Sequence, residues 1–445
     1  MSFPKYPTYK DSGVARLGAV PAHWQVLPCR AIVLERTAKN EDAACSDYLS
    51  LMANIGVIPY AEKGDVGNKK PDDLSKCKVV TRGDFVINSM NYGIGSYGLS
   101  DYDGVCSPVY IVLKPLNEIV ESRFAFRIFE NRAFQTYAQS FGNGILEHRS
   151  AINWDILKAI GVGVPPIAEQ KAILGFLDRE TAKIDALVEE QRHLIELLKE
   201  KRQAVISQAV TKGLKPNVPM KDSGVEWLGN VPAHWEVTAL KRLCAAITDG
   251  AHISPETEGG IYPFISTKDV DNDRIDFDGC LTTSDESFQL MVRSGCRPCA
   301  GDVLFSKDGT IGRTVVVRED RDFVVASSLI IMRPNQSDLR SEYLNVLCQS
   351  DVVSRQVDGF VKGAGLPRLS IQNLRKVVGV FPPREEQEEI ADFVLEVGRQ
   401  FDGLGAAARE TVLLLQERRT ALISAAVTGK IDVRDQTPQP EAIAA

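Results

Sequence analysis

The longest amphipathic stretch of the chain runs from Pro165 to Gly213, and no Gly or Pro interrupts it between Phe176 and Lys212. Apolar side chains recur in it every seven residues, which is typical of a coiled-coil seam. They are Leu177, Ile184, Leu198 and Val205, with Gln191 as the one polar member of the series and with Leu187 and Leu194 at the d-type positions between them. The pattern predicts a long helix that packs against a second helix.

The same stretch occurs a second time, 217 residues later. Pro382-Pro383 and Glu386-Gln387 repeat Pro165-Pro166 and Glu169-Gln170, and the repeat ends with a Ser-x-Ala-Val-Thr motif like the first. Shifted by 217, the seam positions are again all apolar: Val394, Phe401, Ala408, Leu415 and Leu422. Gly398, Gly403 and Gly405 each cost up to ~1 kcal/mol relative to Ala in a helix. We therefore expect a second long helix with a looser middle.

A shorter repeat precedes each long stretch, here at an offset of 211. Asp11-Ser-Gly-Val and Ala22-His23-Trp24 recur as Asp222-Ser-Gly-Val and Ala233-His234-Trp235. No carboxylate or nucleophile accompanies the two histidines at a spacing that suggests catalysis. We interpret these segments as docking segments in which Trp24 and Trp235 are buried anchors.

The two segments between each Trp and the next Pro pair are 140 and 146 residues long and share little sequence. Both contain short β-like runs punctuated by Gly, with helices near their ends. Gly83-Asp84-Phe85 and Gly301-Asp302-Val303 each read as a turn that leads into a buried strand. The expected fold class is α+β: two globular mixed α/β domains, separated by two long antiparallel coiled-coil helices, with an internal pseudo-twofold repeat.

The composition of the chain excludes few classes of function. The formal net charge is −7, with 52 basic and 59 acidic residues, so a nucleic-acid partner is not indicated by charge alone. Nine scattered Cys fit a reducing cytoplasm, and the single C-x-x-C at Cys296–Cys299 lacks a second ligand pair for zinc. No signal peptide and no membrane-spanning run are visible. We expect a cytoplasmic protein with no metal site.

Catalytic motifs are not found. Gly93 to Gly98 matches G-x-G-x-x-G but lacks a following helix and a suitably placed acid, and Gly309-Thr-Ile-Gly-Arg lacks the Lys-Ser/Thr of a phosphate-binding loop. Asp269, Asp271 and Asp273 begin like a calcium loop that lacks its Gly and its closing Glu. We expect that the chain is not an enzyme.

Taken in order, these motifs resemble the specificity (S) subunit of type I restriction-modification systems. The resemblance is carried by Pro-Pro-x-x-Glu-Gln at the start of each long stretch, by Ser-x-Ala-Val-Thr at its end, and by the D-S-G-V…V-P-x-H-W segment before each variable domain. Within the variable domains, Gly83 to Asn88, Tyr102 to Gly104, Thr248 to His252 and Gly301 to Arg313 look like recurrent target-recognition stretches. The resemblance covers essentially the whole chain.

This resemblance implies a chain that reads double-stranded DNA within a larger complex. Each target-recognition domain would read one half of a bipartite asymmetric site, and the paired helices would set the unread spacer and dock two methyltransferase subunits, with restriction subunits joining them. S-adenosylmethionine would bind the partner methyltransferase, and ATP and Mg²⁺ the partner restriction subunit, with no cofactor in this chain. The implied organisation is an N-terminal conserved segment (1–24), target-recognition domain 1 (25–164), a central long helix (165–213), a repeated segment (214–235), target-recognition domain 2 (236–381), a distal long helix (382–430) and a flexible tail (431–445).

Bases are read by Arg, Lys, Asn and Gln at groove edges, and phosphates are held by Lys, Arg and backbone N–H groups. By sequence count the first domain has a net charge of −1 and the second of −3, so cations have to be segregated on one face or supplied by partners. Gly-flanked polar loops are the most plausible positions for contacts. The candidates are Lys69, Lys70, Asn88, Asn91 and Arg149 in the first domain, and His252, Lys268, Lys307, Arg313, Lys362 and Arg368 in the second.

Three other functions remain open at this stage. The chain could be a coiled-coil scaffold with two protein-binding heads, or the specificity chain of another DNA methyltransferase or nuclease system. It could also be an enzyme fused to recognition domains, although the absence of catalytic motifs counts against this.

Overall fold

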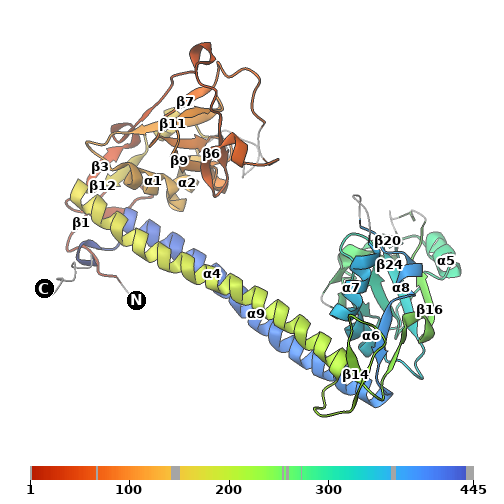
Figure 1. Ribbon diagram of the computed structural model, residues 1–445. Helices are drawn as coiled ribbons and strands as arrows, with labels where there is room; N and C mark the ends of the chain where they lie inside the picture. Colours follow the sequence, from red (N-terminus) through yellow and green to blue (C-terminus); the bar gives the residue numbers. More distant parts are fainter. Residues whose placement is uncertain are drawn as a thin grey trace. The chain divides into compact units, whose positions relative to one another are not determined.

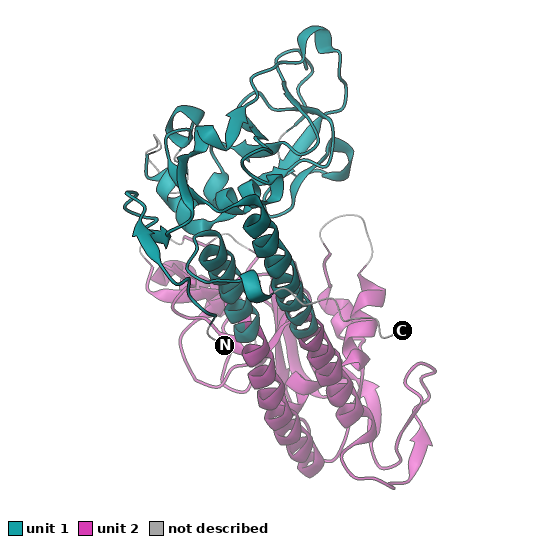
Figure 2. Ribbon diagram, turned by 90° about the vertical axis from the view of Figure 1, so that its left-hand side faces the viewer, with its two compact units in different colours: residues 1–191, 410–445 teal, residues 192–409 magenta. Residues whose placement is uncertain are grey.

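The computed structural model describes residues 3–66, 69–141, 151–252, 255–256, 260–271, 273–361 and 367–436. The chain forms two compact units (Figure 2). Unit 1 comprises residues 1–191 and 410–445, and unit 2 comprises residues 192–409. Each unit therefore contains one of the two variable domains together with part of both long helices.

The two long helices expected from the sequence are α4 (Ile167–Lys212) and α9 (Arg384–Val427). Within each unit they lie side by side (Figure 1). In unit 1, α4 begins beside the end of α9 and Asp185 pairs with Arg419, so the two segments run antiparallel. The helix α9 continues through Gly398, Gly403 and Gly405, so the looser middle expected from these residues does not break it.

The seam between the helices is only partly as expected. Leu177, Ile184, Val394, Ala408 and Leu422 are buried, and Leu198, Val205, Phe401 and Leu415 are half-buried. The prediction that Leu187 and Leu194 fill the seam was wrong, because these side chains are 45% and 40% exposed. Positions four residues after the seam residues, rather than three, point inward: Thr181 and Val188 are buried. Side chain type alone did not indicate this, since Thr181 is polar and both leucines are apolar.

An Arg–Asp pair joins the two long helices in each unit, and the two pairs are related by the 217-residue offset. In unit 1, Arg419 Nε lies 2.9 Å from Asp185 Oδ1, and in unit 2, Arg202 Nη1 lies 2.8 Å from Asp402 Oδ1. A Cβ atom on Gly398 would lie 3.5 Å from the Arg202 guanidinium. This is an ordinary van der Waals distance, so the Arg202 contact does not by itself require a glycine at position 398.

The repeated His-Trp motif fastens the beginning of one long helix beside the end of the other. In unit 1, Trp24 Nε1 donates to Glu169 Oε1 at 2.8 Å, and His23 Nε2 lies 2.7 Å from Glu169 Oε2. The Trp24 ring also lies 3.2 Å from where a Cβ of Gly429 would be, just after α9. We call Trp24, Glu169 and Gly429 the clasp of unit 1. Trp24 is fully buried, so the sequence-based interpretation of an anchor is confirmed.

Unit 2 has the same clasp with the two helices exchanged. Trp235 Nε1 donates to Glu386 Oε2 at 2.9 Å, and His234 Nε2 lies 2.8 Å from Glu386 Oε1. The Trp235 ring packs against Gly213, which follows α4 with φ = 75°, and a Cβ there would lie only 3.1 Å from the ring. The repeated Glu of the Pro-Pro-x-x-Glu-Gln motif is therefore the acceptor of the clasp.

The repeated Gln of this motif joins each long helix to its variable domain. Gln170 is fully buried; its Nε2 donates to the carbonyls of Ile119 and Pro165, and its Oε1 accepts from Glu121 N, at the N-cap of the short helix that follows. Gln387 makes the equivalent bonds to Asp338, Pro382 and Arg340. A buried amide with all these partners fixes the domain against the helix.

The variable domain of unit 1 is built on a four-stranded antiparallel sheet of order β4-β11-β8-β9. Its strands are short runs of alternating or fully apolar residues, as the sequence predicted. The elements of unit 1 before α4 are β1 (Tyr9–Asp11), β2 (Ala19–Pro21), β3 (Gln25–Pro28), β4 (Val33–Glu35), β5 (Leu49–Met52), β6 (Gly56–Pro59), β7 (Lys78–Val80), β8 (Phe85–Asn88), β9 (Tyr97–Leu99), β10 (Gly104–Cys106), β11 (Tyr110–Pro115), α1 (Ser122–Glu130), α2 (Arg132–Gln139), α3 (Trp154–Leu157) and β12 (Gly161–Val164).

Unit 2 repeats this plan with a sheet of order β16-β24-β21-β22, and adds a three-stranded sheet, β20-β17-β23, beside helix α5. Beside their four-stranded sheets the two variable domains therefore carry different smaller sheets, which in unit 1 are the two-stranded sheets β5-β6 and β7-β10. Its elements between the long helices are β13 (Met220–Asp222), β14 (Asn230–Pro232), β15 (Glu236–Ala239), β16 (Cys244–Asp249), β17 (Tyr262–Ile265), β18 (Val270–Asp271), β19 (Arg274–Ile275), β20 (Leu281–Thr283), α5 (Asp285–Arg293), β21 (Val303–Ser306), β22 (Thr314–Val316), β23 (Val324–Val325), β24 (Leu329–Pro334), α6 (Ser341–Cys348), α7 (Asp351–Phe360), α8 (Ile371–Leu374) and β25 (Val378–Phe381).

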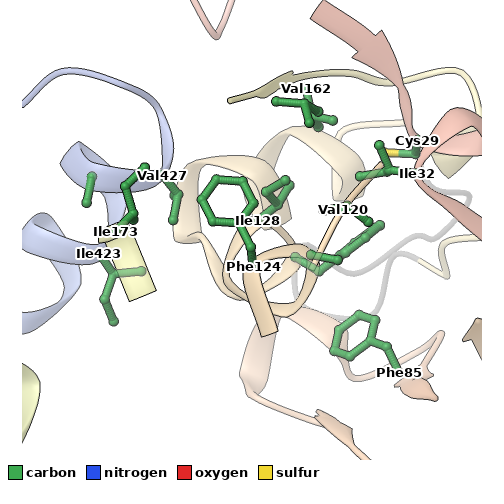
Figure 3. Packing of buried hydrophobic residues seen from close by; sticks show 14 of the residues in the cluster. Cys29, Ile32, Phe85, Val120, Phe124, Ile128, Val162, Ile173, Ile423 and Val427 are labelled. Carbon is green, nitrogen blue, oxygen red and sulfur yellow. The ribbon is translucent and has the colours of Figure 1, made fainter. Parts of the chain in front are cut away.

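The long helices share the hydrophobic core of each variable domain. In unit 1, Figure 3 shows Ile173 of α4 and Ile423 and Val427 of α9 beside Phe124 and Ile128 of α1. In unit 2, Ile206, Val210 and Ile390 of the long helices belong to the same cluster as Phe305 and Tyr343. Because the helices complete both cores, each variable domain is held rigidly on them.

Candidate nucleic-acid interface

Each variable domain presents a hairpin loop at the same place in its four-stranded sheet. In unit 1 the loop joins β8 to β9 and is closed by Asn88 N donating to Ser96 O at 3.0 Å. In unit 2 it joins β21 to β22 and is closed by Ser306 N donating to Arg313 O at 2.8 Å. Gly95 and Gly312 both have φ = 93°, a conformation that favours glycine. The two loops, which we call hairpin loop 1 (residues 88–96) and hairpin loop 2 (residues 306–313), share one backbone framework but not a sequence.

Hairpin loop 2 contains a buried cation. Lys307 has a side chain that is 4% exposed, and its Nζ lies 2.6 Å from Asp249 Oδ2 at the end of β16. His252 Nε2 approaches the same carboxylate oxygen, also at 2.6 Å. Burial alone would raise the pKa of the Asp249 carboxyl, but the hydrogen bonds from Lys307 and His252 outweigh it and hold the pKa below its ordinary value. Asp249 therefore remains ionised and fixes both basic side chains.

These residues line an open cleft with a volume of about 570 Å³. Its other wall is the segment from Arg368 to Gln372, which is joined to hairpin loop 2 by Leu369 N donating to Lys307 O. Arg368 is exposed and its Nε lies 3.1 Å from Asp308 Oδ1. The structure thus brings three predicted residues, His252, Lys307 and Arg368, into one cleft. Their donors are of the kinds that hold phosphates and base edges.

The remaining candidates of the second domain are dispersed. Arg313 at the end of hairpin loop 2 is 37% exposed, and its Nη1 donates to Val270 O at 3.1 Å, close to Asp271. Lys268 is exposed in a short 3₁₀ turn after β17. Neither belongs to the residues that line the cleft. Lys362 lies outside the described residues.

In the first domain, Asn88 and Asn91 lie together in hairpin loop 1. Asn88 is buried, and its side-chain oxygen accepts from Met90 N at 3.1 Å, so its amide shapes the loop. Asn91 is half-buried, and its side chain does not cap the short turn that follows it. Lys69 and Lys70 are exposed between β6 and β7, where Lys70 Nζ donates to Ser46 O. Arg149 lies outside the described residues.

The structure also shows residues that the sequence-based selection missed. Asp249 orders the cleft of unit 2; it lies in the motif from Thr248 to His252, of which the sequence-based prediction includes only the histidine. Ser370 and Gln372 line the same cleft. A carboxylate repels DNA and is not expected among the contacts, yet Asp249 positions the two basic side chains. The exposed apolar side chains of hairpin loop 1, Met90 and Ile94, are likewise absent from the sequence-based candidates for DNA contacts.

We expect Asp249→Asn to destabilise unit 2 by ~3 kcal/mol, because it leaves the buried Lys307 ammonium without its counter-charge. Lys307→Met removes the buried charge and leaves Asp249, which is 21% exposed, with His252 as a partner, so it should destabilise unit 2 less than Asp249→Asn does. The double variant should be more stable than Asp249→Asn alone, as measured by urea unfolding. If the effects of the two single changes simply add, the two side chains are not coupled.

Other kinds of site find no support in the part of the chain that the structure describes. No group of three or more His, Cys, Asp or Glu side chains is placed to hold a metal ion there. The nine cysteines, all within the described ranges, are free thiols. Among the same residues, no helix is long and apolar enough to cross a membrane.

Comparison with known proteins agrees with this architecture. The chain is 25% identical over 292 residues to the type I restriction enzyme EcoBI specificity subunit of Escherichia coli, an alignment that covers 63% of this chain and 60% of that protein. It is 21% identical over 347 residues to the EcoKI specificity subunit of Escherichia coli K12, covering 75% of this chain and 70% of the relative. The aligned region thus spans less than two thirds of the first of these proteins.

A chain from a solved structure of a type I restriction-modification system shares the fold, with a TM-score of 0.69 and 17% identity over 92% of this chain and 98% of that one. Residues 45–197 and 232–406 both match the family described as the type I restriction modification DNA specificity domain. These two matches contain both hairpin loops, two thirds of α4 and about half of α9. The chain belongs to the family of type I restriction-modification specificity subunits.

Proposed function

We propose that this chain is the DNA sequence-specificity subunit of a type I restriction-modification complex. The observation that carries the proposal is one framework, built twice, that holds two different surfaces. The clasp, the buried Gln and the order of the strands in the four-stranded sheet are the same in both units, whereas hairpin loop 1 has no charged residue and hairpin loop 2 contains Lys307, Asp308 and Arg313. A protein that reads two unrelated short sequences needs this combination.

Each variable domain reads one half of a two-part asymmetric DNA site. The cleft of unit 2, with His252, Lys307 and Arg368, contributes to one reading surface, and hairpin loop 1 to the other. The long helices form an antiparallel coiled coil with pseudo-twofold symmetry and determine the length of the unread spacer. The equivalent pairs Arg202–Asp402 and Arg419–Asp185 support this symmetry, because each unit makes the same contact with the roles of α4 and α9 exchanged.

The chain itself catalyses no reaction and carries no cofactor. Two methyltransferase subunits dock on the repeated framework and supply the S-adenosylmethionine site, and restriction subunits that use ATP and Mg²⁺ join them. Repetition of the clasp supports binding of the same partner twice, since each unit offers the same repeated elements. DNA recognition and methyl transfer are then separate tasks of separate chains.

The test is to map methylated bases in DNA treated with the methyltransferase subunit of the same system, with and without this chain. We expect methylation at one bipartite sequence only when both chains are present. Exchanging residues 236–381 for the corresponding domain of another specificity subunit should change one half-site and leave the other unchanged. Methylation by this chain alone, or a change in both half-sites, would contradict the proposal.

A further inference from the structure

Hairpin loop 1 carries no charged residue, in contrast to its counterpart, although each loop has an Ile directly before its positive-φ Gly, Ile94 and Ile311. It reads Asn-Ser-Met-Asn-Tyr-Gly-Ile-Gly-Ser from residue 88 to residue 96, whereas hairpin loop 2 contains Lys307, Asp308 and Arg313. One backbone contact is equivalent in the two loops: Ser89 O accepts from Ile152 N just as Lys307 O accepts from Leu369 N. If the loop of unit 2 lines a DNA-reading cleft, the loop of unit 1 occupies the same place with a different chemistry.

Large apolar side chains of hairpin loop 1 point into solvent. Met90 is 48% exposed and Ile94 is 53% exposed. Two further exposed apolar residues, Val109 and Ile55, belong to segments that are hydrogen-bonded to this loop: Ser89 Oγ donates to Val109 O, and the N of Asn54, the residue before Ile55, donates to Gly95 O. The four side chains form what we call the apolar rim. A cluster of exposed apolar side chains beside a functional loop indicates a binding surface.

The grooves of DNA expose few apolar groups that the apolar rim could contact. The 5-methyl group of thymine projects into the major groove and is the group that apolar side chains contact there. Asn91 lies between Met90 and Ile94 in the sequence, and an Asn amide pairs with the N6 and N7 atoms of adenine. Both partners of an A·T pair are therefore matched by neighbouring side chains of one loop.

We propose that hairpin loop 1 reads at least one A·T pair in its half-site, with Met90 or Ile94 in contact with the thymine methyl group and Asn91 facing the adenine. The apolar rim is a specificity-determining surface, and the charged cleft of unit 2 reads its half-site by a different chemistry. This inference rests on the proposed function, since it requires that unit 1 bind DNA in a sequence-specific manner.

The test uses the assembled complex with methyltransferase subunits and a duplex that carries its mapped site. Each thymine of the half-site read by unit 1 is replaced in turn by deoxyuridine, which lacks only the methyl group. We expect one replacement to weaken binding about fourfold, because a buried methyl group contributes ~0.8 kcal/mol and tenfold corresponds to ~1.4 kcal/mol. The Met90→Ser/Ile94→Ser variant should bind the thymine and deoxyuridine duplexes equally.

The other half-site provides the control, since the same variant should leave its base preferences unchanged. Two results would overturn the inference while leaving sequence-specific binding intact: a half-site for unit 1 that contains only G·C pairs, or a deoxyuridine effect that persists in the double variant. If the double variant loses methyltransferase subunits instead of thymine discrimination, the apolar rim is a protein-docking surface and the inference is wrong. If the complex with the unmodified chain shows no sequence-specific binding at all, the proposed function itself is contradicted.

Discussion

Trp235→Ala is expected to lower the free energy of unfolding of unit 2 by about 3–5 kcal/mol. The indole is 1% exposed and fills the space between the start of α9 and the end of α4. Its removal leaves a cavity and also removes one of the two hydrogen bonds that we describe for Glu386, the bond from Trp235 Nε1. Truncation of a large buried aromatic residue with a bonded polar atom is among the most costly single changes.

Trp227 provides a matched control, because it lies in the same repeated segment but is 42% exposed. Trp227→Ala should cost less than ~1 kcal/mol. Hydrogen exchange of the backbone amides, measured separately for residues 192–409 and for the rest of the chain, distinguishes destabilisation of unit 2 from global unfolding. Trp24→Ala should have the mirror effect in unit 1. Equal exchange rates in Trp235→Ala and Trp227→Ala would show that the clasp does not stabilise the unit.

The features that the sequence predicted well are those that it states twice. Glu169 recurs as Glu386 in the long repeat, and Trp24 recurs as Trp235 in the short repeat. In each unit the structure joins the Trp of the short repeat to the Glu of the long repeat. Repetition therefore marked the residues of the clasp before any contact was known. The long helices were equally predictable, since their heptad pattern persists over many turns.

The features that the sequence predicted poorly depend on contacts between distant residues. Leu187 and Leu194 are apolar, as a seam requires. The face of α4 that is turned inward, however, carries Thr181 and Val188 instead. Among the site residues, Lys307 had the right charge, but its pairing with Asp249, 58 residues away, buries it. Tertiary contacts decide which Lys and Arg side chains are exposed. A single sequence does not show these contacts, so it does not show which of the candidates can reach DNA.

Lengthening both long helices by one heptad is expected to lengthen the unread DNA spacer by about three base pairs and to leave both half-sites unchanged. Duplicating residues 184–190 in α4 and residues 401–407 in α9 preserves the seam, because the two segments are themselves related by the 217-residue offset. Seven residues add ~10.5 Å of helix, and one base pair occupies ~3.4 Å. Mapping methylated bases in DNA from cells that express the variant complex measures the spacer directly.

The control is an insertion of two residues in each helix, which rotates the following residues by ~200° and takes the seam out of phase. We expect this shorter insertion to abolish assembly or site-specific methylation, although it adds only ~3 Å. A spacer that stays constant in the heptad variant would mean that the helices do not determine the separation of the half-sites. A spacer that changes together with the half-site sequences would mean instead that the variable domains no longer read DNA independently of the framework that holds them.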